Sequence, residues 1–290
     1  MTAAADDTRD GEVAYRPPAR RLLWPALPLL LIGCVIVISP LLPLPGPNEQ
    51  NLLNRLKPPV WLGGTWGHSL GTDQLGRDML SRILVGGRLT LLIAAAGVMI
   101  GGCVGTILGL IAGYRRGWFD LVLTRLIDAQ LSLPVILLAM SITTTNPTSL
   151  TTLVMVLATI CWAPYARVVR AETLSLRERP FVYALTGLGI RQHQLLFRHL
   201  FPNVLNIFLV MAAIEIAVTV LAESALSFLG LGVQPPNVSW GMMLAQGRSY
   251  MKSAWWMVVF PGLAITVVVL SVNLFGDALR ARFNPREVVE

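Results

Sequence analysis

Residues 167–203 read RVVRAETLSLRERPFVYALTGLGIRQHQLLFRHLFPN, and they separate two strongly apolar stretches at 150–165 and 204–226. Both stretches are typical of membrane-spanning helices. Neighbouring helices in a bundle need only about 2–8 residues to connect them, so this connection is much longer than a turn requires. It is rich in arginine, and its apolar residues recur at helical spacing. These features indicate a surface that docks on another molecule.

Composition indicates a membrane protein. Of the 290 residues, 54% are hydrophobic and 13% are charged, and the mean hydropathy is +0.63. Soluble domains carry about 25% charged residues, and runs of about 20 apolar residues match the thickness of a bilayer. We therefore predict an all-α, polytopic fold with six transmembrane helices, at about 22–44, 89–112, 121–142, 150–165, 204–226 and 255–275. Small residues four apart let helices approach closely, and the second span has them at Gly97, Gly101, Gly105 and Gly109.

Arginine and lysine set the orientation. The net charge is +7, and the excess of basic residues falls on the inside if the N-terminus is cytosolic, as the positive-inside rule expects. We interpret this charge as an orientation signal and a contact with membrane lipid, not as nucleic-acid binding. The predicted parts are a cytosolic tail (1–21), a first transmembrane helix (22–44), an extracytoplasmic loop (45–88), a core of five helices (89–276) that includes the cytosolic loop 167–203, and a cytosolic C-terminal tail (277–290).

The sequence lacks the residue patterns of two classes of site, a nucleotide-binding loop and a metal site. The lysines, Lys57 and Lys252, do not follow a glycine, so there is no phosphate-binding loop of the form G-x-x-x-x-G-K-[ST]. Any ATP that drives the protein is therefore bound by another chain. The three cysteines lie far apart and have no metal-ligand spacing. We predict no metal site, no cofactor and no catalytic residue in this chain.

The segment from Pro180 to Pro202 predicts a helix, a glycine turn and a second helix. Proline suits the first turn of a helix, where its missing N–H is not needed, and Gly189 permits a break or a positive φ. We expect Pro202 to close the second helix and Asn203 to cap the helix that follows. Two alternatives stay open, a helix that lies in the lipid headgroups and one that docks on a cytosolic partner. An apolar stripe lies on each side of the glycine, formed by Phe181, Ala184, Leu185 and Leu188 and by Leu195, Leu196 and Leu200.

A resemblance favours the second alternative. Residues 181–205, FVYALTGLGIRQHQLLFRHLFPNVL, resemble the EAA loop of ATP-binding-cassette importer permeases, whose helix inserts into the ATPase subunit. That pattern has Glu-Ala-Ala, a glycine four residues later and a proline further on. Tyr183 and Leu185 replace the glutamate and the second alanine here, whereas the glycine and the proline keep their spacing. The resemblance implies that the ATPase-coupling residues are Tyr183, Ala184, Leu185, Leu188, Gly189, Ile190 and Pro202.

Two further segments resemble a narrower family. Residues 70–91, LGTDQLGRDMLSRILVGGRLTL, and 221–244, LAESALSFLGLGVQPPNVSWGMML, are similar to the C-type subunit of dipeptide and oligopeptide permeases. The resemblance implies a type I importer fold in the bacterial cytoplasmic (inner) membrane and ATP-driven import of short peptides. It also implies three kinds of partner: a homologous second permease subunit, two subunits or domains that bind ATP and Mg, and an extracytoplasmic substrate-binding protein. Nickel permeases share much of this pattern, so import of nickel or another small solute stays open, as does proton-coupled transport.

A charged cluster lies shortly before the second span. Asp73, Arg77, Asp78 and Arg82 recur at spacings of four or five residues. We therefore expect opposite charges to pair along a short helix that is exposed outside the membrane. This element either forms a local ion-paired cap or helps to close the outer mouth and meets the binding protein, through Asp73, Arg77 and Asp78.

Carboxylates inside membrane spans are costly and are often functional. Glu215, Glu223 and Asp128 are therefore candidates for the translocation path, where Glu215 could meet the amino terminus of a peptide. For Glu223 and Asp128 the alternative is a structural hydrogen bond to a partner helix. For Glu223 the structural role is the favoured one, because it lies near the outer end of its span. The tryptophans of the same outer region are expected to anchor in the membrane interface, and they are Trp240, Trp255 and Trp256.

Overall fold

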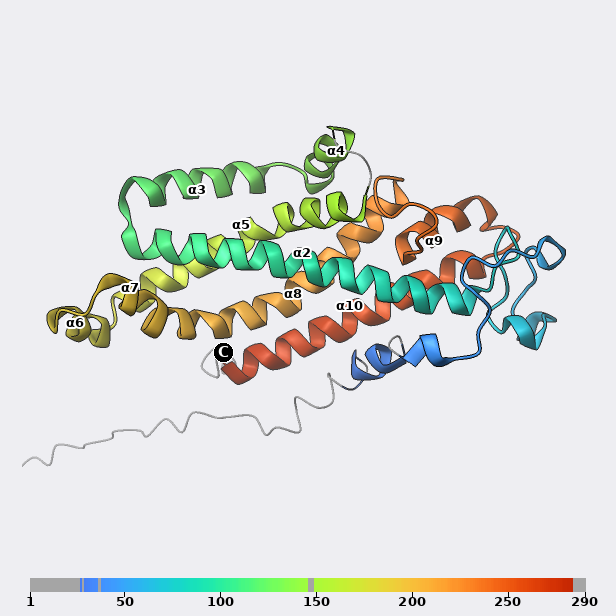
Figure 1. Cartoon of the computed structure of the whole chain (residues 1–290), viewed down its shortest axis with the longest axis horizontal. Coiled ribbons are helices and arrows are strands. Elements are labelled where there is room, and N and C mark those ends of the chain that lie inside the picture. Colours follow the sequence, from blue (N-terminus) through green and yellow to red (C-terminus); the bar gives the residue numbers. More distant parts are fainter. Residues whose placement is uncertain (1–26, 28, 36–37, 146–148, 284–290) are drawn as a thin grey trace, which may run out of the picture.

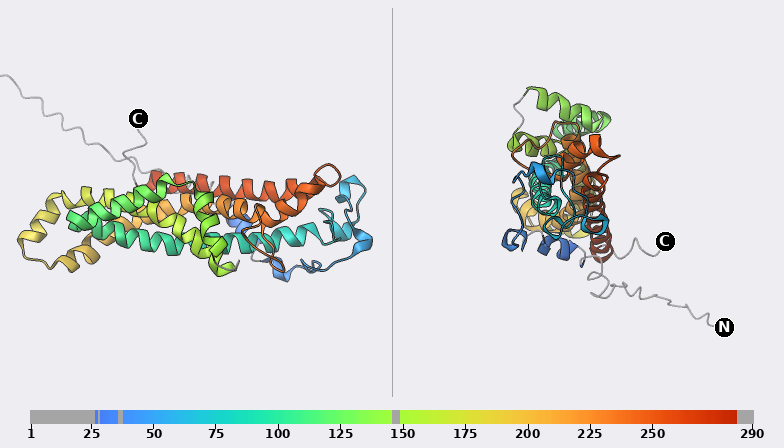
Figure 2. Two further views of the ribbon diagram at one scale, coloured as in Figure 1. Left: turned by 90° about the horizontal axis from the view of Figure 1, so that it is seen from above. Right: turned by 90° about the vertical axis from the view of Figure 1, so that its right-hand side faces the viewer.

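The computed structural model describes residue 27 and residues 29–35, 38–145 and 149–283 of the chain. These residues contain no β-strand, only an isolated bridge between Thr72 and Asp78. Four long helices lie side by side along the long axis of the molecule (Figures 1 and 2), and they are α2 (Met79–Arg115), α5 (Leu150–Arg177), α8 (Phe201–Phe228) and α10 (Trp256–Phe283). The predicted all-α fold class is confirmed.

Shorter elements lie around this bundle and at its two ends (Figure 1). We call one end the α6 end, because α6 (Pro180–Gly187) and α7 (Gln192–Gln194) form the connection there between α5 and α8. At the opposite end, the α9 end, α9 (Trp240–Gly247) lies beside the segment that precedes α2. Two further helices, α3 (Gly117–Ser132) and α4 (Val135–Thr145), connect α2 to α5. The remaining elements are a π-helical turn at Leu195–Leu200 and 3-10 turns at Ser39–Leu41, Leu52–Asn54, Val60–Leu62, Trp66–His68 and Arg248–Tyr250.

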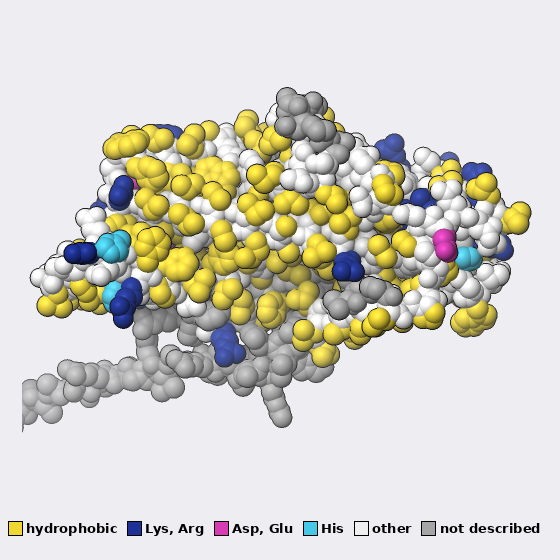
Figure 3. All heavy atoms as spheres, in the orientation of Figure 1, with side chains coloured by type: hydrophobic (Ala, Val, Ile, Leu, Met, Phe, Trp, Pro, Cys, Tyr) yellow, Lys and Arg dark blue, Asp and Glu magenta, His cyan; other side chains and the backbone are white. Residues whose placement is uncertain are grey.

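Several helices are long and apolar enough to cross a membrane. They are α2, α5, α10 and the continuous helix Gln192–Phe228 that contains α8, and α3 with α4 makes a fifth if the bent pair is one span. Figure 3 shows a broad apolar surface along these helices. The first predicted span, 22–44, lies partly outside the described residues, although residues 29–35 are helical. The tail 1–21 lies wholly outside them, so the count of six spans stays a prediction.

The helices extend beyond the predicted spans. α2 begins at Met79 and not near residue 89, α5 continues past residue 165 to Arg177, and α10 continues past residue 275 to Phe283. Hydropathy detects only the part of a helix that is apolar all round, because charged turns at its ends lower the average. As a result, residues 167–177, which the sequence predicted as loop, are the last three turns of α5.

The third predicted span, 121–142, corresponds to two helices, α3 and α4, with a sharp bend between them. α3 and α4 meet at an angle of 94° across a short break. Leu133 has an extended backbone there, with φ −86° and ψ 135°, and Pro134 follows it. Proline disfavours a helical conformation in the residue before it and has no N–H to donate to the preceding turn. The proline therefore turns α4 away from the direction of α3.

The glycines of α2 form the tightest helix contact of the bundle. A Cβ added to Gly101 would lie 2.4 Å from the Ala158 carbonyl oxygen of α5, and one added to Gly105 would lie 2.2 Å from the Trp162 carbonyl oxygen. The residue numbers rise by four on both helices, so α2 and α5 run parallel with the predicted small-xxx-small face against the partner backbone. This confirms that the glycines allow close helix approach.

Candidate functional site

The α6 helix is held to the bundle by one face and leaves the other face open. It starts at Pro180, in the first turn as predicted. Val182 is 3% exposed and packs in a cluster with residues of α2, α5 and the start of α8. Tyr183 and Leu188 are 66% and 80% exposed. α6 and its C-cap residue therefore expose an aromatic ring and an apolar side chain, as a docking helix requires. α6 lies at the tip of the molecule (Figure 1).

A glycine turn follows α6, as the sequence predicted. Gly189 has φ +74°, and the Ile190 N–H donates to the Leu185 carbonyl (3.3 Å). A Cβ at Gly189 would meet no atom within 4 Å, so its backbone conformation alone requires glycine. Of the predicted stripe, Leu185 is half-buried, whereas Phe181 and Ala184 are exposed. The stripe thus faces mainly outward, and the neighbouring Val182 is the residue that packs α6 against the bundle.

The second helix of this loop does not end at Pro202. It starts at Gln192, passes through a π-helical turn at Leu195–Leu200 and continues as α8. Pro202 lies in the first turn of α8, directly after the π turn, where the regular hydrogen-bond pattern is already interrupted. Asn203 does not cap α8, because its side chain donates to the His199 carbonyl (2.6 Å). The connection between α5 and α8 is therefore shorter than predicted.

Arginines on the last turns of α5 hold the α6 end together. Arg170 forms an ion pair with Asp120 of α3, with Nη2 and Oδ2 2.8 Å apart. Arg177 donates to the Tyr114 carbonyl at the end of α2 (2.7 Å). Both arginines are only partly exposed, so these contacts fix α2 and α3 against the helix that leads into α6. Movement imposed on α6 would therefore reach the bundle through α5.

An open cleft of about 620 Å³, which we call the α5–α8 cleft, lies between α5, α8 and α10 at the α6 end. Charged and amide side chains line its mouth, with Glu172, Arg179 and Asn206 among them, and apolar residues of α8 such as Val210 and Ile214 line its deeper part. Carboxylate, guanidinium and amide groups thus share one hollow with an apolar floor. Such a hollow suits a small ligand that carries both charges and apolar surface.

Two of the carboxylates predicted for a translocation path lie elsewhere. Asp128 of α3 pairs with Arg167 of α5 (Oδ1 to Nη2, 2.7 Å), and both side chains are about half exposed. Glu215 of α8 is 9% exposed, and neither residue lines the cleft. Asp128 therefore joins two helices in this structure, which corresponds to the structural alternative for it.

The third carboxylate, Glu223, is fully buried near the end of α8. It accepts a hydrogen bond from the Ser227 hydroxyl one turn later (2.7 Å). The Ser239 hydroxyl, at the N-cap of α9, lies 3.4 Å from that of Ser227. A Cβ on Gly241 would lie 2.5 Å from the Ser224 carbonyl oxygen. Glu223 thus belongs to a polar chain that holds α9 closely against α8.

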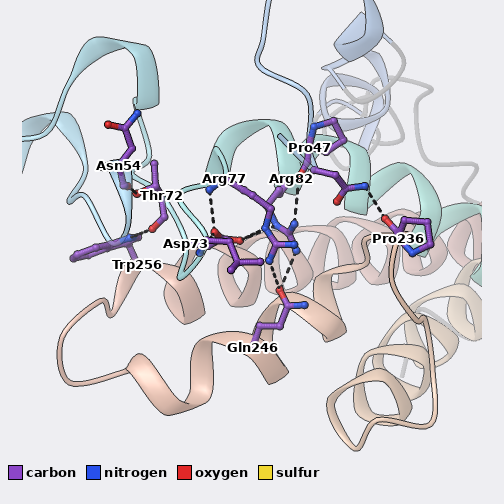
Figure 4. Close-up of polar contacts among 11 residues, drawn as sticks. Pro47, Asn54, Thr72, Asp73, Arg77, Arg82, Pro236, Gln246 and Trp256 are labelled. Carbon is purple, nitrogen blue, oxygen red and sulfur yellow. Dashed lines mark hydrogen bonds and ion pairs between the residues drawn. The ribbon is translucent and has the colours of Figure 1, made fainter. Parts of the chain in front are cut away.

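A buried charge network lies at the α9 end (Figure 4). Asp73 is 2% exposed, and its Oδ2 lies 2.6 Å from Arg77 Nε and 3.6 Å from Arg82 Nε. Both guanidinium groups donate to the Gln246 side-chain oxygen of α9, at 3.2 and 3.0 Å, and Arg82 also donates to the Pro47 carbonyl (3.1 Å). The network therefore joins the turn before α2 and the first turn of α2 to two parts that are distant in sequence, Pro47 and Gln246 of α9.

The predicted exposed helix at this position is wrong. Residues 73–77 form a turn and not a helix, and Asp78 pairs with His68 (Oδ1 to Nδ1, 3.1 Å) and not with an arginine. Asp78 also caps α2, because its side chain accepts from the Ser81 N–H (2.8 Å). Asp73, Arg77 and Asp78 are all buried. The sequence predicts exposed charges here because it does not show that α9 and the segment before residue 73 cover these three side chains.

Two of the three tryptophans predicted for the membrane interface are core residues. Trp240 is 1% exposed and donates through Nε1 to the Ile83 carbonyl (2.8 Å). Trp256 is 5% exposed and donates to the Thr72 carbonyl (3.0 Å). Both rings pack between α2, α9 and α10. Only Trp255, at 38% exposed, keeps an open side.

Comparison with known proteins identifies the family. The model of the "Binding-protein-dependent transport system inner membrane component" family matches residues 105–289. The chain belongs to this family. A putative peptide transport system permease protein of Brucella suis is 38% identical over 263 residues, which cover 90% of this chain and 86% of the relative. The di/tripeptide transport system permease protein DppC of Pseudomonas aeruginosa is 39% identical, with 89% and 85% covered. The dipeptide permease protein DppC of Alkalihalophilus pseudofirmus is 38% identical, with 89% and 86% covered.

As a member of this family, the chain is a multi-pass inner-membrane component of a transport system that depends on a binding protein. The family resemblance predicted from the sequence is thus confirmed.

The sequence analysis missed the residues of the α5–α8 cleft, because it placed 166–203 outside the membrane spans. Residues 168, 172 and 175 of α5 line the cleft, and this spacing of three or four would have revealed one helix face had α5 been extended. Arg179, which follows α5 with an extended backbone, also lines the cleft. The described residues contain no group of three or more metal-ligating side chains.

Proposed function

We propose that this protein is a transmembrane permease subunit of an ATP-driven importer that moves short peptides across the bacterial cytoplasmic membrane. Family membership supports the importer role, and the peptide permease relatives support the substrate class. The observation that carries the mechanism is α6, whose exposed Tyr183 and Leu188 form the tip of the bundle. The proposed partners are a homologous second permease subunit, two subunits or domains that bind ATP and Mg, and an extracytoplasmic binding protein.

In this proposal the α6 end and both termini face the cytosol, and the α9 end faces outward. Residues 183–190 sit in a socket of the ATPase subunit, where Tyr183 supplies the contact that a glutamate makes in the family pattern. α6 moves with that subunit when ATP binds, and the arginine contacts of α5 transmit the movement to α2 and α3. Rigid-body rocking then alternates access between the two sides. The continuous helix Gln192–Phe228, which contains Pro202, carries the movement to α8, the wall of the cleft opposite α5.

The α5–α8 cleft is proposed as the cytosolic mouth of the path. A short peptide is zwitterionic, and the cleft offers Glu172 for its amino group and Arg179 for its carboxylate. The apolar floor then tolerates varied side chains. Asp73, Arg77 and Asp78 are proposed to hold in place the outer surface that meets the binding protein, because they are themselves buried. Glu215 and Glu223 are proposed to act near the path by fixing α8.

Substrate class is tested by uptake into vesicles that contain the complete importer and its binding protein. We expect a labelled dipeptide to be taken up only when ATP is present on the side of the ATPase subunits. An excess of unlabelled dipeptides should lower the uptake rate by tenfold or more. A nickel chelate should not compete. Competition by nickel alone would instead assign the subunit to a nickel importer. Uptake driven by a proton gradient without ATP would contradict the importer proposal itself.

Coupling through α6 is tested by Leu188→Asp, which places a carboxylate in an apolar docking surface. Burial of an unpaired charge at an interface costs roughly 2 kcal/mol or more, so we expect binding of the ATPase subunits and peptide transport to fall by at least about tenfold. The matched control for ATPase binding is Leu53→Asp at the α9 end, where the leucine is 91% exposed and lies away from the proposed ATPase surface. Normal ATPase assembly and transport in Leu188→Asp would show that α6 is not the docking element.

A further inference from the structure

A second hollow lies at the α6 end, apart from the α5–α8 cleft. It has a volume of about 250 Å³ and lies between the last turns of α2 and the start of the helix that leads into α8. Arg115, Gln192 and His193 supply its polar lining, and Ile111 and Phe197 are among its apolar residues. No acidic side chain lines it. We call this hollow the α2–α7 cleft.

The charge of this cleft is not neutralised locally. Arg115 is exposed, and within the described residues its guanidinium has no ion pair. Its neighbour Arg116 is different, because it pairs with Glu178 (2.8 Å). A second cation lies behind the cleft wall: the Arg177 guanidinium is 5.6 Å from the ring centre of Tyr114, which lines the cleft. The cleft therefore presents a positive potential to any group that enters it.

An apolar track leads away from the cleft along α2. Ile100, Val104 and Ile107 are 42–49% exposed and recur every three or four residues, so they lie on the same face of α2 as Ile111. On the facing helix, Phe197 is 61% exposed at the cleft. Figure 3 shows basic and histidine side chains at the α6 end bordering a broad apolar surface. A positive cleft thus continues directly into an apolar face of membrane-spanning helices.

We propose that the α2–α7 cleft binds the phosphate headgroup of an anionic phospholipid, with its acyl chains along the α2 track. Basic pockets between transmembrane helices on the cytoplasmic side suit such headgroups. A free phosphate would gain only the charge contact, whereas a lipid also buries exposed side chains of α2 and Phe197. The lipid would bridge α2 and the helix that follows α6, and so steady the connection that docks the ATPase. This site goes beyond the transport function proposed above.

The test measures lipid bound to the complete importer, purified from nanodiscs of phosphatidylcholine with a minority of phosphatidylglycerol, by native mass spectrometry. We expect selective retention of phosphatidylglycerol, and about a fivefold loss in Arg115→Gln, as one basic residue near a lipid surface predicts. Arg115→Lys should keep most of the bound lipid. Arg55→Gln, an exposed arginine at the α9 end, is the matched control and should behave as the original protein.

Three outcomes would overturn this proposal. Equal phosphatidylglycerol retention in Arg115→Gln and the unchanged protein would remove the role of the cleft. Equal retention of phosphatidylcholine and phosphatidylglycerol would leave an apolar contact without a headgroup site. Lipid that binds the separate chain but is displaced in the complete importer would make the cleft a protein-docking surface. A thermal melt of each variant in phosphatidylcholine nanodiscs confirms that Arg115→Gln is folded.

Discussion

Replacement of Asp73 by asparagine is expected to lower the free energy of unfolding by about 3–5 kcal/mol. Asp73 is the carboxylate that neutralises both Arg77 and Arg82, and the three side chains are 2%, 8% and 1% exposed. Asparagine has nearly the same shape but no charge, so two guanidinium groups would stay buried without a counter-ion. Its side chain would also accept less strongly from the Leu75 and Arg77 N–H groups that now donate to Asp73.

The measurement is the unfolding midpoint of the purified subunit in detergent, with limited proteolysis of residues 45–78 as a local readout. We expect faster cleavage in Asp73→Asn, because the network joins this segment to Gln246 of α9. Glu49→Gln is the matched control, since Glu49 is an exposed carboxylate of the same segment that accepts only from the Gly46 N–H (3.1 Å). An Asp73→Asn protein as stable as Glu49→Gln would show that the network does not hold this end.

A double-mutant cycle separates the pair from its surroundings. Asp73→Asn combined with Arg77→Gln removes the carboxylate together with one guanidinium. We expect the double variant to lose less stability than the sum of the two single variants, because residues in one buried network couple. Additive losses would instead indicate that Asp73 acts only through its backbone contacts.

Replacement of Gly101 by leucine is expected to prevent correct packing of α2 against α5. The first side-chain carbon alone would lie 2.4 Å from the Ala158 carbonyl oxygen and 2.8 Å from Cys161 Cβ. Backbone atoms cannot rotate away, so the two helices must separate. Added methylene groups in a packed core cost about 1–3 kcal/mol, and more where the backbone must move. We expect little monodisperse protein on size exclusion after expression.

The graded variant Gly101→Ala and a control at Gly187 complete this test. Gly101→Ala introduces only the Cβ and should retain folded protein with a lower unfolding midpoint. A Cβ at Gly187 of α6 meets no atom within 4 Å, so Gly187→Leu should fold normally. Normal yield and midpoint for Gly101→Leu would mean that α2 and α5 are not packed at this distance.

Residue patterns predicted much of the α6 loop but not which side of it faces the bundle. Pro180 and Gly189 have strong conformational preferences, and both lie where these preferences placed them. Val182 of α6 and Leu188 at its C-cap are both apolar, yet Val182 is 3% exposed and Leu188 is 80% exposed. Local pattern cannot distinguish a side chain that packs on the protein from one kept for a partner, because both are hydrophobic.

The ends of the helices and the α5–α8 cleft could not be predicted from the sequence either. Charged turns at residues 167–177 read as loop, although they continue α5 and carry arginines that bind α2 and α3. Once those turns were excluded from the helices, Val168, Glu172 and Ser175 had no common face. The cleft they line with α8 therefore could not be predicted.

By itself the sequence determined the all-helical membrane class, the glycine face of α2, the helix and glycine turn that follow Pro180, and the family. Each follows from residue type and spacing along the chain. Only the tertiary structure decided that Asp73, Arg77 and Arg82 are buried under α9, that Trp240 and Trp256 are core residues, and that Asp128 is paired with Arg167. Burial and pairing depend on which distant segments cover a side chain, and hydropathy and spacing within one segment carry no information about that.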